Sequence, residues 1–571
     1  MSVSSLPFLH GALAAVLPKL AAWRRDFHAH PEAGWTEFRT AALIIRRLRE
    51  LGYAIRMGEA ACASDRRMGV PSSAVLAAAR ERALEHGADA ELVAGMGDGY
   101  TGFWADLDCG PGPVTAFRFD MDCNEVAECA EESHRPVREG FASRWPGLMH
   151  ACGHDGHAAV GLGLAEVLVS IRRHLRGRIR LIFQPAEEGA RGALPMSEAG
   201  AVDGVDVLFG FHIGFKAEGP GSLICGTQGF LATTKRDVLF SGVPAHAGAA
   251  PEEGKDALLA ACSAVVNLHA ISRNGKGGTR IAVGRLEGGE ARNVIPASAR
   301  LFMETRGETT ELDAYMTAES ERILRASADL WGCACEWRTV GNSAGGGSSP
   351  ELARLIATVA EAMGGWKTVI PMSGFGATED FACLMSRVQA SGGLASYLQV
   401  GTDRAAGHHS DRFDFDETCL GRALELLARL AVRMAGGGQE DTETETESDM
   451  EFLDEVVRRK GIHVQLWLEG EDGEGFGRGR VELLQLVDEL GSLSKAAKQL
   501  GMSYRGAWGK IKKAERIAGE TLVDASGTKR DGYSLTPAGR ELVQRFQQWY
   551  ADVESFAKKR AEALFSYFDK E

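Results

Sequence analysis

Short hydrophobic runs alternate with longer amphipathic stretches in the first part of the chain. The runs at 114–119, 179–183 and 205–211 are rich in Val, Ile, Leu and Phe, which predicts buried strands. Stretches with helical spacing of apolar residues, such as 158–175, lie between them. Alternating strands and helices predict an α/β fold with a mostly parallel sheet, and ligands bind such sheets at the carboxyl ends of the strands.

Residues 229–342 interrupt this pattern. Strand-like and helical stretches follow one another there in the order β-α-β-β-α-β, which predicts a ferredoxin-like α+β insert. We therefore expect residues 1–228 and 343–436 to form one discontinuous domain, and residues 229–342 to form a separate domain.

Residues 437–451 form a predicted linker. Glycines open this segment, and six of the ten residues at 440–449 are acidic, so it cannot bury apolar surface. Beyond it, in residues 452–571, apolar spacing predicts three short helices, a two-stranded wing at 522–536 and a long helix at 537–565. This order predicts a winged helix-turn-helix domain.

Composition narrows the class of protein. The chain has 571 residues, of which 44% are hydrophobic, so large cores can form and extensive disorder is excluded. Its eleven cysteines follow no disulfide framework, and its apolar stretches fall short of the ~18 residues of a membrane span. We therefore expect a cytoplasmic protein without a membrane partner. The net charge is −14, yet residues 451–571 contain 20 basic and 20 acidic side chains, so the excess acid lies in the rest of the chain.

The segment from Met149 to His157 (MHACGHDGH) holds several potential metal ligands. Cys152 and His154 are two residues apart and would project to the same side of an extended backbone. Thiolate and imidazole ligands together suit zinc or another borderline divalent ion. A small buried cysteine beside hydrogen-bonded histidines is the alternative.

Two adjacent carboxylates, Glu187 and Glu188, follow a predicted buried strand and a proline. One carboxylate can bind a metal ion while its neighbour acts on a water molecule. Such pairs also occur on solvated faces, and spacing alone does not decide. Further along, His408 and His409 precede an alternation of aromatic and acidic residues. Adjacent side chains point in opposite directions, so we expect at most one of these histidines to be a ligand.

Eight motifs occur in order within residues 5–435, among them MHACGHDGHAA, LIFQPAEEG, GVPAHAGAAPEEGKDAL and GHHSDRFDFD. Together they resemble the metal-dependent amidohydrolases related to aminoacylase and carboxypeptidase G, in the branch with a cysteine ligand. The segment 58–101 and the GHHSDRFDFD ending are most similar to the A subunits of aminobenzoyl-glutamate hydrolases. This resemblance implies hydrolysis of the amide bond of an N-acyl or N-aroyl amino acid such as p-aminobenzoyl-glutamate.

The resemblance also implies roles for individual residues. Two divalent metal ions are expected, with manganese favoured and zinc acceptable, and Glu187 matches the general base. The insert is expected to close over the site and to form a homodimer, and a homologous second subunit is an alternative partner. His246 matches an oxyanion-stabilising residue supplied by the partner's insert, and Arg292 and Asn293 match the position that binds the substrate carboxylate. The expected metal ligands are Cys152, His154, Glu188, His212 and His409.

Residues 478–565 resemble the winged helix-turn-helix domain of molybdate-responsive regulators, which is related to the LysR-type DNA-binding domain. Nine basic residues against three acidic ones at 495–530 suit double-stranded DNA. Helices that only mediate association are the alternative, and Trp508 could equally be a core residue. The residues expected to face the DNA are Ser503, Tyr504, Arg505, Trp508, Lys512 and Lys513.

Two classes of function are consistent with these features. The first is a metal-dependent amidohydrolase fused to a DNA-binding domain. The second is a transcriptional regulator whose hydrolase-fold domain serves as a ligand sensor. Glu187 favours the enzyme, because a pure sensor does not need a general base.

Overall fold

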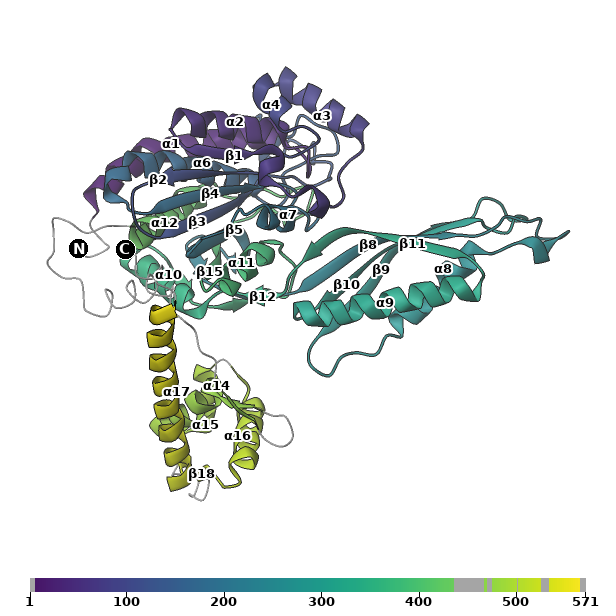
Figure 1. The fold of residues 1–571 in the computed structure, drawn as a ribbon. Helices are drawn as coiled ribbons and strands as arrows, with labels where there is room; N and C mark the ends of the chain where they lie inside the picture. Colours follow the sequence, from purple (N-terminus) through teal and green to yellow (C-terminus); the bar gives the residue numbers. More distant parts are fainter. Residues whose placement is uncertain (1–5, 436–466, 470–474, 501, 525–532, 565–571) are drawn as a thin grey trace. The chain divides into compact units, whose positions relative to one another are not determined.

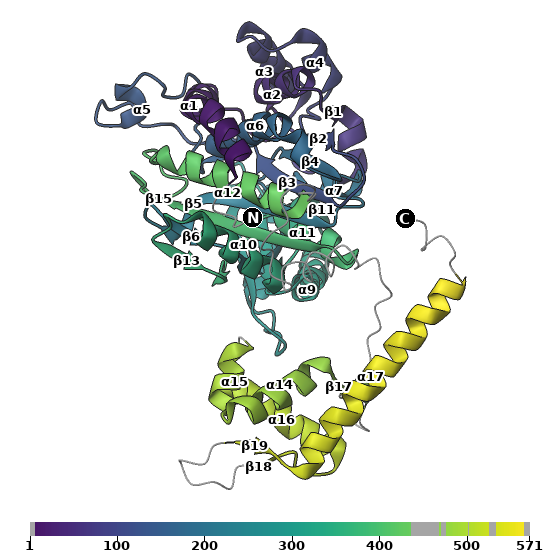
Figure 2. The ribbon, with the colours of Figure 1, turned by 90° about the vertical axis from the view of Figure 1, so that its left-hand side faces the viewer.

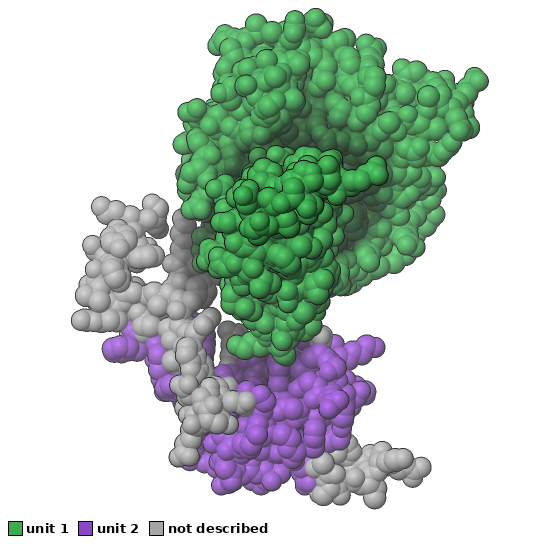
Figure 3. All heavy atoms as spheres, turned by 90° about the vertical axis from the view of Figure 1, so that its right-hand side faces the viewer, with its two compact units in different colours: residues 1–457 green, residues 458–571 purple. Residues whose placement is uncertain are grey.

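The chain folds into two compact units, residues 1–457 and 458–571 (Figure 3). The computed structural model describes residues 6–435, 467–469, 475–500, 502–524 and 533–564. The predicted linker at 437–451 lies outside the described residues, as does the start of the predicted C-terminal domain. Within the described residues, no helix is long and apolar enough to span a membrane.

An eight-stranded sheet forms the centre of the first unit (Figure 1). Its four middle strands, β4, β3, β5 and β15, are parallel, whereas β1 and β2 on one side and β6 on the other run antiparallel to their inner neighbours. The mostly parallel sheet predicted from the sequence is therefore confirmed. The strands in spatial order are β1 (Ala54–Met57), β2 (Phe103–Asp108), β4 (Arg178–Gln184), β3 (Val114–Asp120), β5 (Val207–Glu218), β15 (Leu394–Thr402), β6 (Ser222–Ile224) and β13 (Thr368–Ile370).

Helices cover both faces of this sheet, which explains why its middle strands are hydrophobic in almost every position. In β3, for example, Phe117 and Phe119 belong to one buried cluster, whereas Ala116 belongs to the cluster on the opposite face. The first cluster packs against α1 (Pro7–Ala29), α2 (Phe38–Glu50), α6 (His154–Ser170), α10 (Pro350–Met363) and α12 (Thr418–Ala435), and the second against α7 (Ala193–Glu198) and α11 (Phe381–Ala390). The remaining elements are α3 (Ser73–Glu85), α4 (Ala90–Gly95), α5 (Arg135–Arg138) and a small sheet of β7 (Thr227–Phe230), β12 (Gly346–Gly347) and β14 (Ser373–Gly374).

A four-stranded antiparallel sheet with two helices is inserted between β7 and β12, and we call it the lid. Along the chain it has the predicted β-α-β-β-α-β order, and in space its strands lie in the order β11-β8-β10-β9. Both helices pack on the same face of the sheet, with small alanine side chains of α8 allowing close approach. The elements are β8 (Ala232–Ser241), α8 (Ala257–His269), β9 (Thr279–Gly288), β10 (Ser298–Gly307), α9 (Thr310–Leu330) and β11 (Ala334–Ser343).

The second unit contains three short helices around the N-terminal part of a long one (Figure 2). Its core is formed by apolar residues such as Val487, Ala507 and Ile511, which are fully buried. A short antiparallel pair of strands lies at the position of the predicted wing, whose tip is outside the described residues. The elements are β16 (Trp467–Glu469), β17 (Gly475–Gly477), α14 (Arg478–Leu490), α15 (Leu493–Gln499), α16 (Tyr504–Ala518), β18 (Val523–Asp524), β19 (Ser534–Leu535) and α17 (Pro537–Leu564).

Candidate metal centre and nucleic-acid interface

The start of α6 presents the first two candidate ligands. Gly153 has a φ of +95°, a conformation that favours glycine, and it turns the chain between Cys152 and the first helical residue, His154. The expected extended backbone at this point was therefore wrong. The helix start is fixed by a buried ion pair, because Nε of Arg24 donates to Oδ2 of Asp155 at 2.8 Å. Breaking such a buried pair typically costs ~3–5 kcal/mol.

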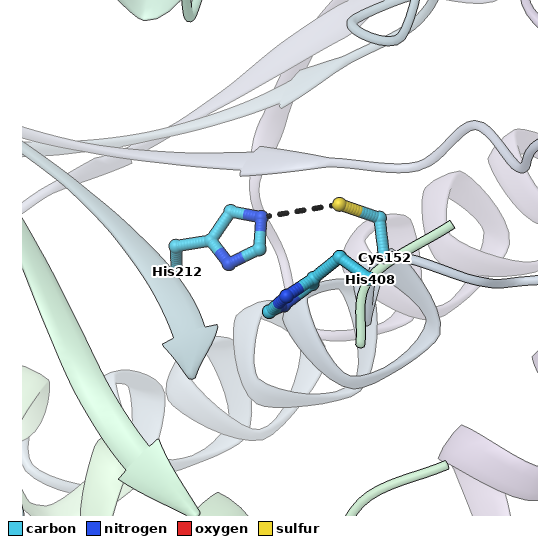
Figure 4. A group of neighbouring side chains, drawn as sticks. All are labelled: Cys152, His212 and His408. Atoms are coloured by element: carbon cyan, nitrogen blue, oxygen red, sulfur yellow. Dashed lines mark hydrogen bonds between the residues drawn. The ribbon is translucent and has the colours of Figure 1, made fainter. Parts of the chain in front are cut away.

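Cys152 and His212 face each other across the site (Figure 4). His212 lies within β5, which continues to Glu218 instead of ending before the histidine as the sequence suggested. Nδ1 of His212 donates to the carbonyl oxygen of Ile213 at 2.9 Å. Nε2 therefore keeps its lone pair and lies 3.4 Å from Sγ of Cys152, a separation that suits two ligands of one metal ion.

His154 and Glu188 form the other side of the site. Nδ1 of His154 donates to the carbonyl oxygen of Asp122 at 2.9 Å, and the backbone N–H of Glu188 donates to Oδ2 of the same aspartate at 3.0 Å. Nε2 of His154 and Oε1 of Glu188 are buried, lack any hydrogen-bond partner among the described residues, and lie 3.9 Å apart. Buried polar atoms without partners are rare, and a cation between these two would satisfy both.

His408 and His409 differ in what their nitrogens already do. Nε2 of His408 lies 3.2 Å from the carbonyl oxygen of Ile213, and its Nδ1 accepts from Arg404 at 2.8 Å, so both ring nitrogens have partners. Burial lowers the pKa of His408 to about 4. His409 has a left-handed backbone, with φ of +65°, and its Nε2 lies 3.2 Å from Oε2 of Glu188. The structure thus brings His409, and not His408, against the carboxylate of Glu188.

The five predicted ligands form a continuous group. Ligand atoms of Cys152, Glu188 and His409 lie within 4.8 Å of one another, and so do those of His154, Glu187 and Glu188. His212 joins the group through its contact with Cys152. One thiol, three imidazoles and one carboxylate fit a pair of borderline divalent cations.

Glu187 lies beside this group with a different environment. Burial raises the pKa of Glu187 well above its usual value, and the nearby carboxylates of Glu379 and Glu188 raise it further. Its Oε2 lies 3.9 Å from Nε2 of His154. Glu187 is therefore next to the candidate ligands and is placed to hold a proton.

A buried charged network that the sequence did not reveal lies next to Glu187. Glu379 accepts from Nη2 of Arg118 at 2.9 Å and from the hydroxyl of Tyr397 at 2.7 Å. Asp380 accepts from the amide of Gln184 at 2.7 Å. A charged Arg118 inside an otherwise apolar strand was the available signal, because a buried arginine requires carboxylate partners.

The three predicted lid residues lie together in two neighbouring loops. His246 forms an isolated bridge with Val294, and the N–H of Ala247 donates to the carbonyl oxygen of Asn293 at 3.0 Å. Arg292, Asn293 and His246 are all exposed at the surface of the lid. Nδ1 of His246 accepts two backbone N–H groups at 3.1 Å, which leaves Nε2 without a partner among the described residues.

These loops lie at the end of the lid remote from the candidate metal ligands. Ser241 at the end of β8 pairs with Ser298 at the start of β10, and both loops extend from this end. At the opposite end, Ala232 pairs with Gly307 and follows directly on β7, next to the main sheet. Figure 1 shows the strands of the lid running away from that sheet, and Figure 3 shows a recess beside the lid in unit 1. Within one chain, His246, Arg292 and Asn293 therefore do not join the group around Cys152.

The helix-turn-helix candidates lie at the start of α16. Ser503 is the N-cap, and its hydroxyl accepts from the N–H of Gly506 at 3.1 Å. Tyr504 and Arg505 are exposed, and the hydroxyl of Tyr504 lies 2.9 Å from that of Tyr533, beside the wing.

The remaining candidates on α16 are more constrained. Nζ of Lys512 donates to Glu515 at 2.7 Å and lies 4.7 Å over the ring of Trp508. Trp508 is half-buried and packs edge-on against Tyr533, so part of its ring belongs to the domain core. Lys513 is half-buried as well. The structure thus groups all six candidates on one helix and its N-cap, with Arg505 the least constrained side chain.

This combination of sheet, inserted lid and buried thiol-imidazole-carboxylate group defines a metallohydrolase of the peptidase class. Residues 116–433 match peptidase family M20/M25/M40, and the chain belongs to this family of amidohydrolases. Residues 479–540 match the bacterial regulatory helix-turn-helix proteins of the lysR family, so the second unit contains a DNA-binding fold.

Within this family, the chain is similar to three proteins with more specific descriptions. It is 44% identical over 429 residues to the indole-3-acetyl-aspartic acid hydrolase of Enterobacter agglomerans, covering 75% of this chain and 98% of that protein. It is 46% identical over 420 residues to the A subunit of the p-aminobenzoyl-glutamate hydrolase of Escherichia coli K12, covering 73% and 96%. A solved structure of the Bacillus subtilis YXEP protein, a dinuclear metal-binding peptidase of family M20, matches with a TM-score of 0.51 and 25% identity, covering 73% of this chain and 98% of that one.

Proposed function

We propose that this amidohydrolase cleaves the amide bond of an N-acyl or N-aroyl amino acid such as p-aminobenzoyl-glutamate. The names of the two relatives at 44% and 46% identity support this substrate class. The observation that best supports the chemistry is the pair of unpartnered buried atoms, Nε2 of His154 and Oε1 of Glu188, 3.9 Å apart in the middle of the predicted ligand set.

Two divalent metal ions would be held by this group, with manganese favoured and zinc acceptable. When bound, such ions polarise a carbonyl and lower the pKa of water. The ligands would be Cys152, His154, Glu188, His212 and His409. Backbone carbonyls that accept the Nδ1 protons of His154 and His212 support this assignment, because they orient both Nε2 atoms toward the site.

Glu187 would act as the general base and then as the general acid. In this role its carboxylate takes a proton from the attacking water and passes it to the nitrogen of the leaving amine. A raised pKa, caused first by burial and then by Glu379 and Glu188, suits a group that must hold a proton between these two steps.

A second copy of the chain would complete the site. His246, Arg292 and Asn293 lie at the far end of the lid, away from the metal ligands of their own chain. The lid of a second copy would bring these residues to the substrate. His246 would stabilise the oxyanion through its Nε2, and Arg292 with Asn293 would bind the α-carboxylate of the amino acid. A homologous second subunit could supply the same residues.

The second unit would bind double-stranded DNA through α16. The proposed contact residues include the exposed Tyr504 and Arg505. The full set is Ser503, Tyr504, Arg505, Trp508, Lys512 and Lys513. A cytoplasmic location is proposed as well, because all eleven cysteines are free thiols. A regulator that only senses a ligand through the hydrolase fold would bind the substrate without turnover.

The Glu187→Gln variant tests the enzymatic proposal. It is expected to keep its metal content and to lose about 10²–10⁴-fold in kcat, because the amide cannot accept the proton. Metal analysis and kinetics on p-aminobenzoyl-glutamate provide the measurement, with Glu188→Gln as the matched variant that should lose metal. Near-normal turnover in Glu187→Gln would contradict the assignment of the base.

A further inference from the structure

Two cationic side chains border Gly189, the residue that follows the candidate ligand Glu188. They are Lys235 of the lid and Arg191 of the loop after Glu188. Neither makes an ion pair with any carboxylate among the described residues. Cations beside a catalytic group without an acidic partner indicate a place for an anion.

Lys235 lies on the face of the lid sheet that the helices leave open. Along β8, Arg236, Val238 and Phe240 are buried against α8 and α9, whereas Lys235 and the alternate residues are partly exposed. The residue across from it in the sheet, Glu304, is already paired with Arg306. Lys235 is thus not neutralised by its own sheet.

The position of Lys235 relative to the metal ligands follows from the crowded backbone around it. A methyl group placed on Gly341 would overlap the carbonyl oxygen of Gly189 and would lie 3.1 Å from Cδ of Lys235. The stem of Lys235 and the carbonyl oxygen of Gly189 therefore both lie close to Gly341. In the sheet Gly341 pairs with Lys235, and the N–H of the next residue, Asn342, donates to the carbonyl oxygen of Ala190 at 2.8 Å. The strand segment around Lys235 therefore packs against the loop that follows Glu188.

The side chain of Arg191 also lies against Gly189. Its Nε is buried without a hydrogen-bond partner among the described residues. A methyl group on Gly189 would overlap this Nε, and one on Gly69 would lie 2.8 Å from it, so the guanidinium lies between two glycines. The hydrogen bond from its Nη1 to the carbonyl oxygen of Gly69 is long at 3.4 Å. Most of its donors are therefore available.

We propose that Lys235 and Arg191 bind the side-chain carboxylate of an acidic amino acid in the substrate. This inference rests on the proposed amide hydrolysis. Both similar enzymes are named for conjugates of an acidic amino acid, one of aspartate and one of glutamate. Such a leaving group has two carboxylates, and Arg292 with Asn293 accounts for one. The other extends from the scissile amide by a short aliphatic stem and requires a cation near the metal ligands.

The test compares p-aminobenzoyl-glutamate with p-aminobenzoyl-glutamine, which differ only at the end of the side chain. The metal-loaded wild-type protein is expected to prefer glutamate. Lys235→Met should lower kcat/KM for glutamate roughly 10- to 100-fold and leave kcat/KM for glutamine within about twofold, because only the glutamate loses a charge-assisted hydrogen bond. Lys235→Arg should keep most of the preference. Arg191→Met, checked for folding by its thermal transition, should shift the ratio in the same direction.

Arg300→Met is the matched control, because Arg300 lies exposed on the same open face, farther along β10. It should leave the preference unchanged. Equal losses on both substrates in Lys235→Met, or a wild-type protein with no preference for glutamate, would overturn the subsite and leave the amidohydrolase proposal standing. A wild-type protein that turns over neither compound would contradict the proposed substrate class, and the subsite with it.

Discussion

The candidate metal centre and the recognition helix α16 organise their functional residues in opposite ways. The metal centre draws Cys152, Glu188 and His409 from three distant segments, and they range from the buried Cys152 through the half-buried Glu188 to the exposed His409. Helix α16 presents Tyr504 and Arg505 as neighbours in sequence, exposed on one short element. One site depends on the tertiary fold, and the other depends on a single helix start.

This difference has an energetic basis. In the metal centre, Nε2 of His154 and Oε1 of Glu188 are buried without partners among the described residues, so each costs desolvation energy until a cation satisfies it. On α16 the side chains remain hydrated, and binding depends on many small charge contacts with phosphates. Loss of one residue should therefore abolish function in the first site and reduce it gradually in the second.

Cys152→Ala gives the largest expected effect. Sγ of Cys152 lies 3.4 Å from Nε2 of His212 and within 4.8 Å of the ligand atoms of Glu188 and His409, so it links the two sides of the centre. Its removal should lower the metal content of the purified protein and reduce amide hydrolysis to the background rate. Elemental analysis and a metal-supplemented assay are the measurements.

Cys383→Ala is the matched control for this experiment, because Cys383 is also a buried thiol but packs in the core around α11. It should destabilise the protein modestly and leave metal content unchanged. A Cys152→Ala protein with full metal content and activity would show that burial alone, without coordination, explains this cysteine.

His246→Ala should have the next largest effect, and it separates the lid tip from the buried centre. Removing an oxyanion donor typically costs about 10²–10³-fold in kcat. If the lid of a second copy supplies His246, then mixing His246→Ala with Glu187→Gln should restore activity, because one site of the mixed dimer has both residues intact. Kinetics on mixtures of the two inactive proteins provide the measurement. Mixtures as inactive as the separate variants would contradict completion of the site by a second copy.

The sequence predicted those parts of the fold that depend on local hydrophobic pattern. The strands at 114–119 and 179–183 and the order of elements in the lid follow from periodicity alone, because their residues are buried on one or both faces. The turn at Gly153 was missed because it depends on a left-handed backbone that two-residue spacing does not reveal. The contact between Arg118 and Glu379 was missed because it joins residues 261 positions apart in the sequence.

The candidate site shows the same division. Sequence motifs indicated Glu187, Glu188 and His154 as candidates. Only the structure shows that Nδ1 of His154 and of His212 is hydrogen-bonded to a backbone carbonyl, which leaves Nε2 for a metal ion. The sequence could not separate His408 from His409 on geometric grounds. In the structure both nitrogens of His408 already have partners, whereas Nε2 of His409 faces Glu188. The distance between the lid tip and the metal ligands could not be predicted either, because it follows from the register of β8 and β10.

Arg505→Ala should have the smallest effect, and it tests the exposed site on α16. Arg505 makes no hydrogen bond or ion pair with any described residue, so its guanidinium is available for a base edge. Its loss should cost ~1–3 kcal/mol at a specific site and little on other DNA. Lys512→Ala should cost less, because Nζ of Lys512 is held by Glu515 at 2.7 Å and lies over Trp508.

Mobility-shift titrations of the full-length chain over a range of salt concentrations distinguish these two roles. Substitution of a residue that reads a base lowers the affinity at one sequence. Loss of a phosphate contact instead weakens binding to all duplexes and lowers the number of released counterions by about one. Arg545→Ala on α17 is the control, since that arginine pairs with Glu541 on its own helix. If Arg505→Ala binds every duplex as the wild type does, α16 is not the helix that reads the bases. The DNA contacts would then have to come from another element of the unit. If it instead abolishes all binding, the helix depends on one residue as strictly as the metal centre does, and the proposed contrast between buried and exposed sites fails.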